Sequence, residues 1–328
     1  METPAFVRDH LGEVAALGTA VCWSLTPFFF TLASRRVGAF AANVIRLCLA
    51  CVLLTVTVFA VGAAHPMPLR QAALLAASGF VGLALGDAAL FESLVTIGPR
   101  RTALLGATAP IFVVLASAPL LGETMTPIAL AGMAMTLGGV AWVIAARPDE
   151  GEVRGSPVRG VVMGVLAAAG QGIGAILATA GLGEAPAGSW CANLAAGAEG
   201  SIHVSPLLGT QTRMLAGCGG MLLYAAVRGH FGEVGRGFRD RPALKLLAGG
   251  AVFGPFVGVW LSLIAFANTH PRAVAQTIMA LGTIFVILIA WALHRERPTL
   301  RMLLGAIVAV AGAAVLALRE QIAAALGG

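Results

Sequence analysis

The chain has 328 residues, of which 58% are hydrophobic and 11% are charged, with a mean hydropathy of +0.90. A soluble domain carries about 25% charged residues because its surface must stay hydrated, so this composition excludes an ordinary soluble domain. The formal net charge of +6 is compatible either with an acidic partner or with an unequal distribution of charge across a membrane.

Apolar stretches recur along nearly the whole chain, at the length that a bilayer requires. A helix needs roughly 20 mainly apolar residues to cross about 30 Å of hydrocarbon. The first ten residues lack the basic start and the small-residue cleavage site of a signal peptide, so we expect the first span to be retained. The pattern predicts ten spans, at 13–33, 41–62, 71–97, 102–121, 126–146, 158–182, 206–228, 243–267, 273–293 and 300–318.

Several glycines are spaced four residues apart, among them Gly250, Gly254 and Gly258 on one face of the eighth span. Small residues at this spacing let helix backbones approach closely in lipid, so we interpret this face as a packing surface. Four of the five cysteines fall inside spans, and Cys191 lies in a predicted loop. This distribution predicts no intramolecular disulfide.

The two halves of the chain resemble each other. The increase of the offset between matching residues from 148 to 167 indicates an insertion of 19 residues within 183–205. The halves are therefore predicted as two five-span repeats, 1–146 and 158–328, joined by a charged linker at 147–157. The matching pairs include Trp23 with Gln171 at an offset of 148, Arg46 with Arg213 at 167, and Glu123 with Glu296 at 173.

An odd number of spans in each repeat requires the second repeat to enter the membrane from the opposite side. Inverted repeats of this kind are the architecture of secondary transporters, with the substrate held near the midplane. The basic residues agree with the inversion, because fifteen fall on one predicted face and four, Arg8, Arg70, Arg272 and Arg319, on the other. The positive-inside rule then places the fifteen in the cytoplasm, and both termini and 183–205 outside. This asymmetry explains the basic isoelectric point without a nucleic-acid partner.

Several motifs resemble the EamA-type domain of the drug/metabolite transporter superfamily. They are Gly86-Asp87-Ala88-Ala89-Leu90-Phe91, the segment PRRTALLGATAP at 99–110, and Leu121-Gly122-Glu123. Matching pieces recur in the second half, at 273–285 and around Glu296. The resemblance implies a ten-helix carrier that works without ATP, often as an exporter of amino acids or other metabolites. It also implies cytoplasmic termini, opposite to the charge distribution, so both orientations remain open.

Ionisable residues inside a span are costly in lipid and are functional hypotheses by default. Asp87 lies about twelve residues before Pro99, roughly 18 Å along its helix, and is predicted as a lone carboxylate able to bind protons. Glu92 lies about 140° further round the helix, and pairing near the interface is favoured for it. For Arg46 and Arg213 the favoured interpretation is extension to the headgroups, and the alternative is a fixed charge facing an anionic substrate.

The remaining candidates for a substrate or proton pathway are Trp23, Gln171, Trp260 and Gln276. A transporter pocket is mostly apolar and aromatic, with a few polar groups that orient the ligand, although tryptophan in a membrane helix more often serves packing. Glu123 and Glu296 flank the fourth and ninth spans and are predicted to be solvated loop acids.

No catalytic residue, metal site or cofactor is predicted. An intramembrane aspartyl protease needs two carboxylates that share a proton, and no second aspartate lies deep in a span. The six histidines lack metal-ligand spacing, and the Cys48 to Cys51 pair has no second pair of ligands. We therefore expect a multi-pass protein of the bacterial inner membrane, a secondary transporter of a small metabolite, amino acid or drug-like compound. Proton coupling is one hypothesis, and a lipid or lipid-linked-sugar flippase is the alternative function. The substrate, the direction of transport and the oligomeric state stay open.

Overall fold

The computed structural model describes residues 10–145, 156–196, 200–282, 284–286, 289 and 299–325. Every regular element in these residues is a helix, as predicted. The first half contains α2 (Leu11–Val37), α3 (Ala39–Ala60), α4 (Leu69–Gly79), the π-helical segment η1 (Phe80–Gly86), α5 (Asp87–Gly106), α6 (Ala109–Leu121) and α7 (Pro127–Ala145). The second half contains α8 (Pro157–Leu182), α9 (Trp190–Ala196), α10 (Pro206–Arg228), α11 (Phe231–Arg239), α12 (Arg241–Ala251), η2 (Val252–Gly258), α13 (Val259–Asn268), α14 (Arg272–Met279), α16 (Leu300–Ala317) and α17 (Arg319–Ala325).

Seven helices of the described residues are long and apolar enough to cross a membrane: Leu11–Val37, Ala39–Ala60, Leu69–Ser93, Pro127–Ala145, Pro157–Leu182, Arg241–Asn268 and Leu300–Ala317. The apolar helices Ala109–Leu121 and Arg272–Val286 are shorter, and α10 carries the polar residues Gln211 and Arg213. Ten crossings therefore stay a prediction.

Three details differ from the predicted spans. Helical structure continues past the predicted end of the third span, because α5 runs to Gly106. The insertion at 183–205 contains a short helix, α9, which buries Cys191, a residue predicted to lie in a loop. Short helices also form at 231–239 and 319–325, outside the predicted spans.

The helix boundaries follow from capping residues in the sequence. Ser156 and Ser205 accept hydrogen bonds from the backbone N–H groups of Arg159 and Leu208, and each serine precedes a proline that begins the helix. Such caps satisfy N–H groups that have no partner inside the helix. At the opposite ends, α8 and α10 stop at Gly183 and Gly229, whose φ angles of 79° and 71° favour glycine.

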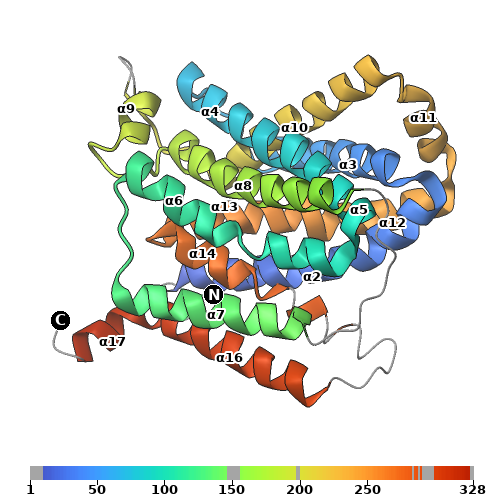
Figure 1. Ribbon diagram of the computed structural model, residues 1–328. Coiled ribbons are helices and arrows are strands. Elements are labelled where there is room, and N and C mark those ends of the chain that lie inside the picture. The colour runs from blue at the N-terminus through green and yellow to red at the C-terminus, as the bar shows by residue number, and fades with distance from the viewer. Residues whose placement is uncertain are drawn as a thin grey trace.

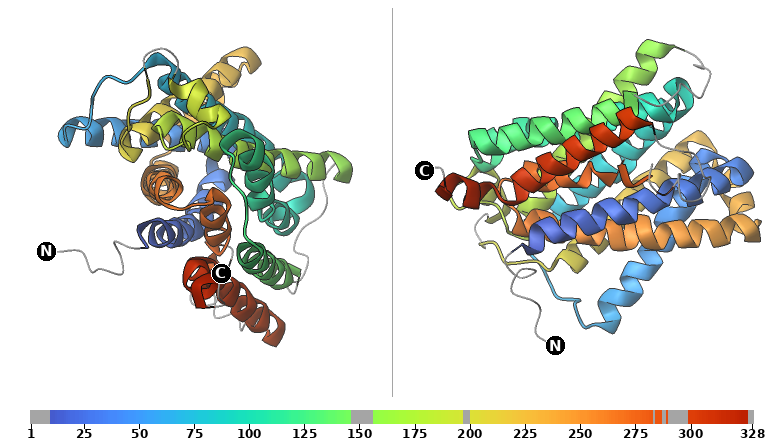
Figure 2. Two further views of the ribbon diagram at one scale, coloured as in Figure 1. Left: turned by 90° about the vertical axis from the view of Figure 1, so that its left-hand side faces the viewer. Right: turned by 90° about the horizontal axis from the view of Figure 1, so that it is seen from below.

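Helices α7 and α16 lie side by side along one edge of the molecule (Figures 1 and 2). This contact is formed by two pairs of glycines that match at the offset of 173, Gly132 with Gly305 and Gly139 with Gly312. A Cβ added at Gly139 would lie 2.6 Å from the carbonyl oxygen of Gly305, and one at Gly132 would lie 3.1 Å from that of Gly312. The absence of side chains therefore sets how closely these two backbones approach.

The two π-helical segments occupy matching positions in the repeats, since η2 begins 172 residues after η1. A π-helical turn widens the helix locally and is often found at functional sites. The predicted packing face of the eighth span meets α2. Hypothetical Cβ atoms at Gly250, Gly254 and Gly258 would fall within 3 Å of Phe30, Thr26 and Trp23 respectively.

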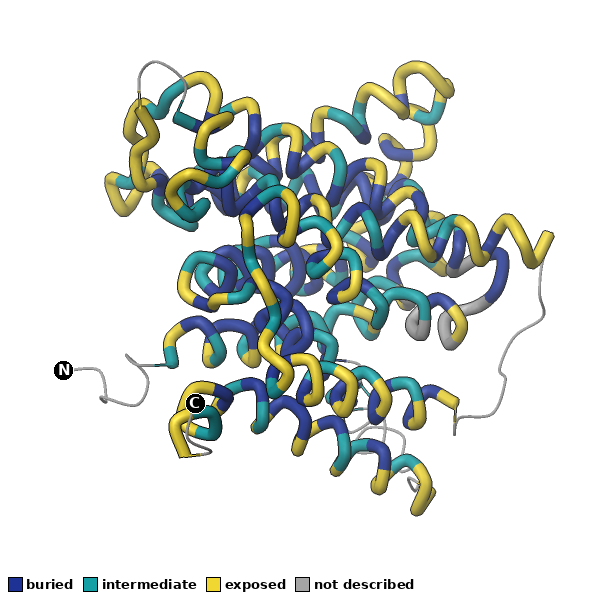
Figure 3. Tube along the Cα trace, turned by 60° about the vertical axis from the view of Figure 1, so that its left-hand side comes forward, coloured by how far each residue is buried: buried dark blue, intermediate teal, exposed yellow. Residues whose placement is uncertain are grey.

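Buried residues gather in the interior of the bundle, and exposed residues cover its outer faces (Figure 3). Two ends of the bundle are distinguished here. The insertion end holds the start of α2, the connection from α6 to α7, residues 183–196 and 200–205, and the connection from α13 to α14. The basic end holds the connection from α2 to α3, the start of α8, and α11 with the start of α12 (Figure 1).

Candidate functional site

Asp87 is buried, with 4% of its surface exposed, and lies at the junction between η1 and α5. Its carboxylate accepts a hydrogen bond from Nη2 of Arg46 on α3, and the two side chains form a buried ion pair. The sequence predicted a lone carboxylate, and this was wrong. Residues 41 positions apart in the chain meet because α3 and α5 both enter the interior of the bundle.

Three further side chains hold the guanidinium of Arg46. Asn43, one turn earlier on α3, accepts a hydrogen bond from Arg46 Nε at 2.6 Å. The rings of Phe30 and Phe91 lie 5.0 Å and 5.7 Å from the guanidinium carbon, within the range of a cation–π interaction. None of these three was predicted from the sequence, although the i, i+3 spacing of Asn43 and Arg46 places them on one helix face.

Arg213, the repeat partner of Arg46, lies on α10 and is 4% exposed. Its backbone packs so closely on the end of α4 that a Cβ at Gly79 would collide with its carbonyl oxygen. The Nη2 atom points toward Gly82 of η1, 3.6 Å from the place that a Cβ would occupy there. The sequence favoured headgroup positions for both arginines, but the structure buries Arg213 and leaves the Arg46 side chain only 14% exposed, paired with Asp87.

Glu92 lies on α5 toward the basic end and forms a 2.5 Å ion pair with Arg159 of α8. Its side chain is 35% exposed and that of Arg159 is 67% exposed. The structure therefore separates the two acids, with Asp87 in the interior and Glu92 in a surface pair. A transport role for Glu92 stays a prediction.

The other four candidates lie on four different helices. Trp23 of α2 packs on η2 at Gly258, and Trp260 of α13 lies 6.4 Å from the ring of Phe256. Gln171 of α8 is half-buried, and Gln276 of α14 is 8% exposed. Their role in a substrate pathway stays a prediction.

At the insertion end, buried ion pairs join the two predicted repeats. Arg272, at the start of α14, is fully buried, and its guanidinium and backbone N–H both donate to the carboxylate of Glu123. The same guanidinium donates to the carbonyl of Glu184 at 2.5 Å. The sequence predicted Glu123 as a solvated loop acid, and this was wrong; Glu296, its repeat partner, lies outside the described residues.

The pKa of Glu123 reflects these contacts. Burial alone would raise this pKa, but the hydrogen bond from His270 and the charge of Arg272 outweigh burial and hold the pKa below its ordinary value. A second pair lies close by, because Arg319 donates to Glu13 at 3.0 Å and to the carbonyl of His270 at 2.6 Å. Both pairs link a residue of 1–146 to a residue of 158–328.

Ion pairs between the repeats at the basic end are more exposed. Arg36 and Asp240, 3.2 Å apart, have side chains that are 48% and 24% exposed, and the Glu92–Arg159 pair is similarly accessible. The ion pairs that join the repeats are therefore more deeply buried at the insertion end than at the basic end. Exposed pairs are worth about 0–1 kcal/mol, whereas breaking a buried pair costs about 3–5 kcal/mol.

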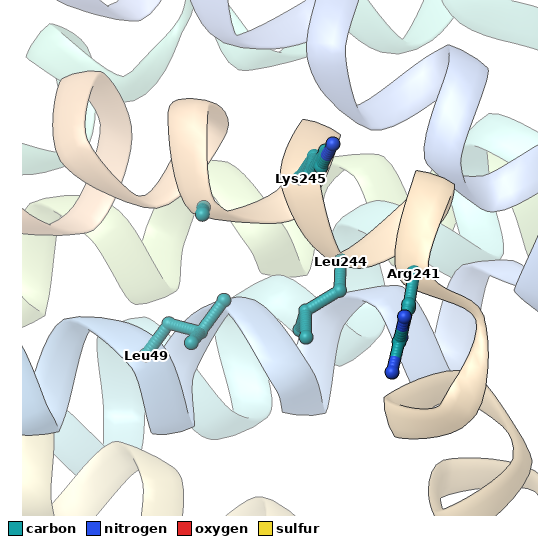
Figure 4. Close-up of a pocket in the computed structure, with 5 residues that line it drawn as sticks. Leu49, Arg241, Leu244 and Lys245 are labelled. Atoms are coloured by element: carbon teal, nitrogen blue, oxygen red, sulfur yellow. The ribbon is translucent and has the colours of Figure 1, made fainter.

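A shallow groove of about 370 Å³ lies between α3 and α12, and Figure 4 shows Leu49 and Leu244 from its two walls. Arg241, Lys245 and Ala248 complete the lining and are exposed. The groove is thus an open surface feature, with apolar walls and basic residues at its rim, and it has no acidic group to serve the predicted proton pathway.

Comparisons with known proteins agree with the sequence motifs. The model of a family described as "EamA-like transporter family" matches residues 10–145 and 182–318. A solved structure titled "Crystal structure of protein" superposes with a TM-score of 0.71 and 17% sequence identity, over 94% of this chain and 98% of that one. No curated protein matches the chain. Within the described residues, no group of three or more histidine, cysteine, aspartate or glutamate side chains could hold a metal ion.

Proposed function

The chain belongs to the EamA-like transporter family, and from this premise we propose that it is a ten-span secondary transporter that moves a small metabolite by alternating access. It is an all-helical, multi-pass membrane protein of the drug/metabolite transporter superfamily. We place it in the bacterial inner membrane and propose that it exports its substrate.

The buried ion pair between Asp87 and Arg46 is the observation that carries this proposal. A charged pair is expensive inside a membrane protein and is often retained for function. The pair lies beside η1, where the helix is locally widened and backbone groups are less regularly bonded. Substrate sites in transporters with inverted repeats also lie at interrupted helices near the midplane.

Alternating access requires one end of the bundle to close while the other opens. The pairs Arg272–Glu123 and Arg319–Glu13 are buried and join the repeats at the insertion end. We propose that this conformation is closed at the insertion end, and that access begins at the basic end. The opposite conformation would have to break both buried pairs.

Proton coupling gives the Asp87–Arg46 pair a mechanism. Protonation of Asp87 would remove its charge and release Arg46, which would then lie unpaired in the interior. A proton and a substrate could thus compete for the site from opposite sides of the membrane. The sequence contains no nucleotide-binding motif of the Walker type, so an ion gradient is the expected driving force.

The test uses purified protein in liposomes, screened by counterflow across amino acids, purines and cationic drugs. For a substrate identified in this way, Asp87→Asn should abolish uptake driven by a pH gradient while gradient-free exchange persists in part. The expected loss is at least about 100-fold in the initial rate of driven uptake, in line with removal of a proton-transfer group. Glu233→Gln, which changes an exposed acid outside the candidate site, is the control and should retain coupling, while Glu92→Gln tests the second candidate acid.

Each contrary result has a specific meaning. If Asp87→Asn still concentrates substrate with a proton gradient as the sole driving force, Asp87 is structural and the coupling hypothesis fails. If neither acid matters, the protein is a facilitator that moves its substrate downhill. If labelled lipid or lipid-linked sugar changes leaflet and no soluble compound exchanges, the protein is a flippase.

A further inference from the structure

The matching arginines of the two repeats, Arg46 and Arg213, differ in their hydrogen bonding. In the first repeat, Arg46 has an acceptor for Nε in Asn43 and a carboxylate for Nη2 in Asp87. The position that matches Asn43 at the same offset of 167 is Thr210. The hydroxyl of Thr210 donates to the carbonyl of Pro206 at 2.7 Å, so this side chain is bonded back to its own helix.

The acid is also missing from the second repeat. The two π-helical segments differ by 172 residues, and this offset carries Asp87 to Val259, a buried residue at the start of α13. Valine has no oxygen to offer a guanidinium. Both acceptors that neutralise and orient Arg46 have therefore been replaced at the positions that match them.

Arg213 is buried as deeply as Asp87, and among the described residues its Nε has no hydrogen-bond partner. Within the same residues no carboxylate lies in ion-pair distance of Arg213, whereas Arg46 and Asp87 neutralise each other. A guanidinium cannot lose its charge under physiological conditions, and an isolated buried charge is strongly unfavourable. Among the described residues, one unit of positive charge in the interior therefore has no counterion.

Backbone rather than side chains surrounds the end of the Arg213 guanidinium. Its Nη2 faces η1 at Gly82, and Gly170 and Gly174 of α8 pack on the same segment. No side chain projects from any of these three positions. Gly82 lies within η1, and Asp87 follows the last residue of η1. Arg213 and the Asp87–Arg46 pair therefore lie beside the same π-helical segment.

We propose that Arg213 binds the carboxylate of a small substrate, which takes the place that Asp87 fills for Arg46. This inference rests on the proposed transport function and names the substrate class. The planar fork of a guanidinium matches the two oxygens of a carboxylate. A single uncompensated positive charge also suits a monocarboxylate better than a phosphate group, which carries about 1.5 to 2 negative charges.

The test measures binding without transport, on the full-length protein in nanodiscs. Acetate, butyrate and benzoate are compared with acetamide, butyramide and benzamide, and with sodium chloride at equal concentration, by the shift of the unfolding temperature. Because a ligand that binds the native state stabilises it, the carboxylates should raise the unfolding temperature of the wild type above the effect of the amides and of chloride. Arg213→Gln should weaken the apparent affinity by about thirtyfold or more, as for loss of one partner of a buried charge pair.

The variants separate binding from a structural role. If Arg213 holds the fold together, Arg213→Gln will unfold at a lower temperature without any ligand; we expect this variant to be as stable as the wild type or more stable, because an uncompensated charge is removed. Val259→Asp, which supplies the acid of the first repeat, should remove the effect of carboxylates while Arg213 is retained. Arg36→Gln, at an exposed arginine, is the control and should bind carboxylates normally.

The proposal is overturned if carboxylates do not shift the wild type, if amides or chloride act equally well, or if Arg213→Gln retains the shift. The same experiments distinguish a failure of the proposed transport function from a failure of the carboxylate assignment. Carboxylate binding that depends on Arg213 but occurs without counterflow of any solute would overturn the proposed function alone. Counterflow of neutral solutes that is unaffected by Arg213→Gln would instead overturn the carboxylate assignment alone.

Discussion

At the scale of single residues, charge inside this membrane protein is concentrated in arginines, and their neighbours decide what each can do. Arg272 is neutralised by Glu123, and Arg46 by Asp87. Burial of an ion pair gives little net stability, but removal of one partner leaves an isolated charge and is strongly destabilising. Paired arginines are therefore expected to affect folding, in contrast to Arg213.

Glu123→Gln should destabilise the protein by about 3–5 kcal/mol at pH 7, because Arg272 is left buried without its counterion. Since the pKa of Glu123 is lowered in the folded state, its stabilising contribution is complete above the unfolded pKa of about 4.3 and is lost as the pH falls through the folded value. The difference between wild type and variant should therefore be constant near neutral pH and shrink below about pH 4. Unfolding by SDS in mixed micelles, at pH 7 and below about pH 4, measures this difference in the free energy of unfolding.

The matched control for this prediction is Glu233→Gln. Glu233 belongs to an exposed pair with His230, 3.4 Å apart, so its loss should cost less than about 1 kcal/mol. Equal stabilities of the Glu123 and Glu233 variants at pH 7 would show that the insertion-end pair does not hold the repeats together.

The sequence could predict which residues carry charge into the membrane, but not their partners. Asp87 was singled out from its depth and Arg46 from its matching place in the two repeats, and their pairing was missed because it depends on how two helices pack. Glu123 was assigned to solvent for the same reason, since Glu123 and Arg272 are 149 positions apart. A helical pattern gives the face and depth of a residue, whereas its partner is set by tertiary structure.

At the scale of helices, the lengths of seven of the ten predicted spans and the glycine spacing were predictable, because both follow from local physical requirements. The bilayer thickness sets the length of a span, and close approach requires a small residue at the contact. The π-helical segments η1 and η2 had no local signal. They recur at matching positions of the two repeats, which indicates that the repeated packing arrangement stabilises them rather than any single residue.

Two adjacent glycines of α7 provide a test of the helix contact. A Cβ at Gly139 would lie 2.5 Å from the backbone nitrogen of Ala309 on α16, whereas nothing lies within 4 Å of a Cβ at Gly138. Gly139→Leu should therefore separate α7 from α16, at a cost of about 1–3 kcal/mol or more, and reduce the yield of monodisperse protein. Gly138→Leu should behave like the wild type on size-exclusion chromatography, and equal yields of the two variants would contradict the assigned contact.

At the scale of the whole molecule, the basic residues at the two ends differ in exposure as well as in number. Of the four basic residues predicted on the sparsely charged face, Arg272 and Arg319 are buried in ion pairs, and Arg70 is exposed; Arg8 lies outside the described residues. At the basic end, by contrast, Arg36, Arg236 and Arg239 are exposed.

This asymmetry predicts that the basic end faces the cytoplasm and the insertion end faces outward. The natural Cys191 is a poor probe of orientation because it is fully buried. In a cysteine-free background, Ser201→Cys at the exposed insertion should react with a membrane-impermeant maleimide in intact cells. Gly232→Cys, in α11 at the basic end, has open space around its Cβ and should react after the membrane is broken. The reverse labelling pattern would contradict the charge argument and place both termini in the cytoplasm. The conformation closed at the insertion end would then face outward.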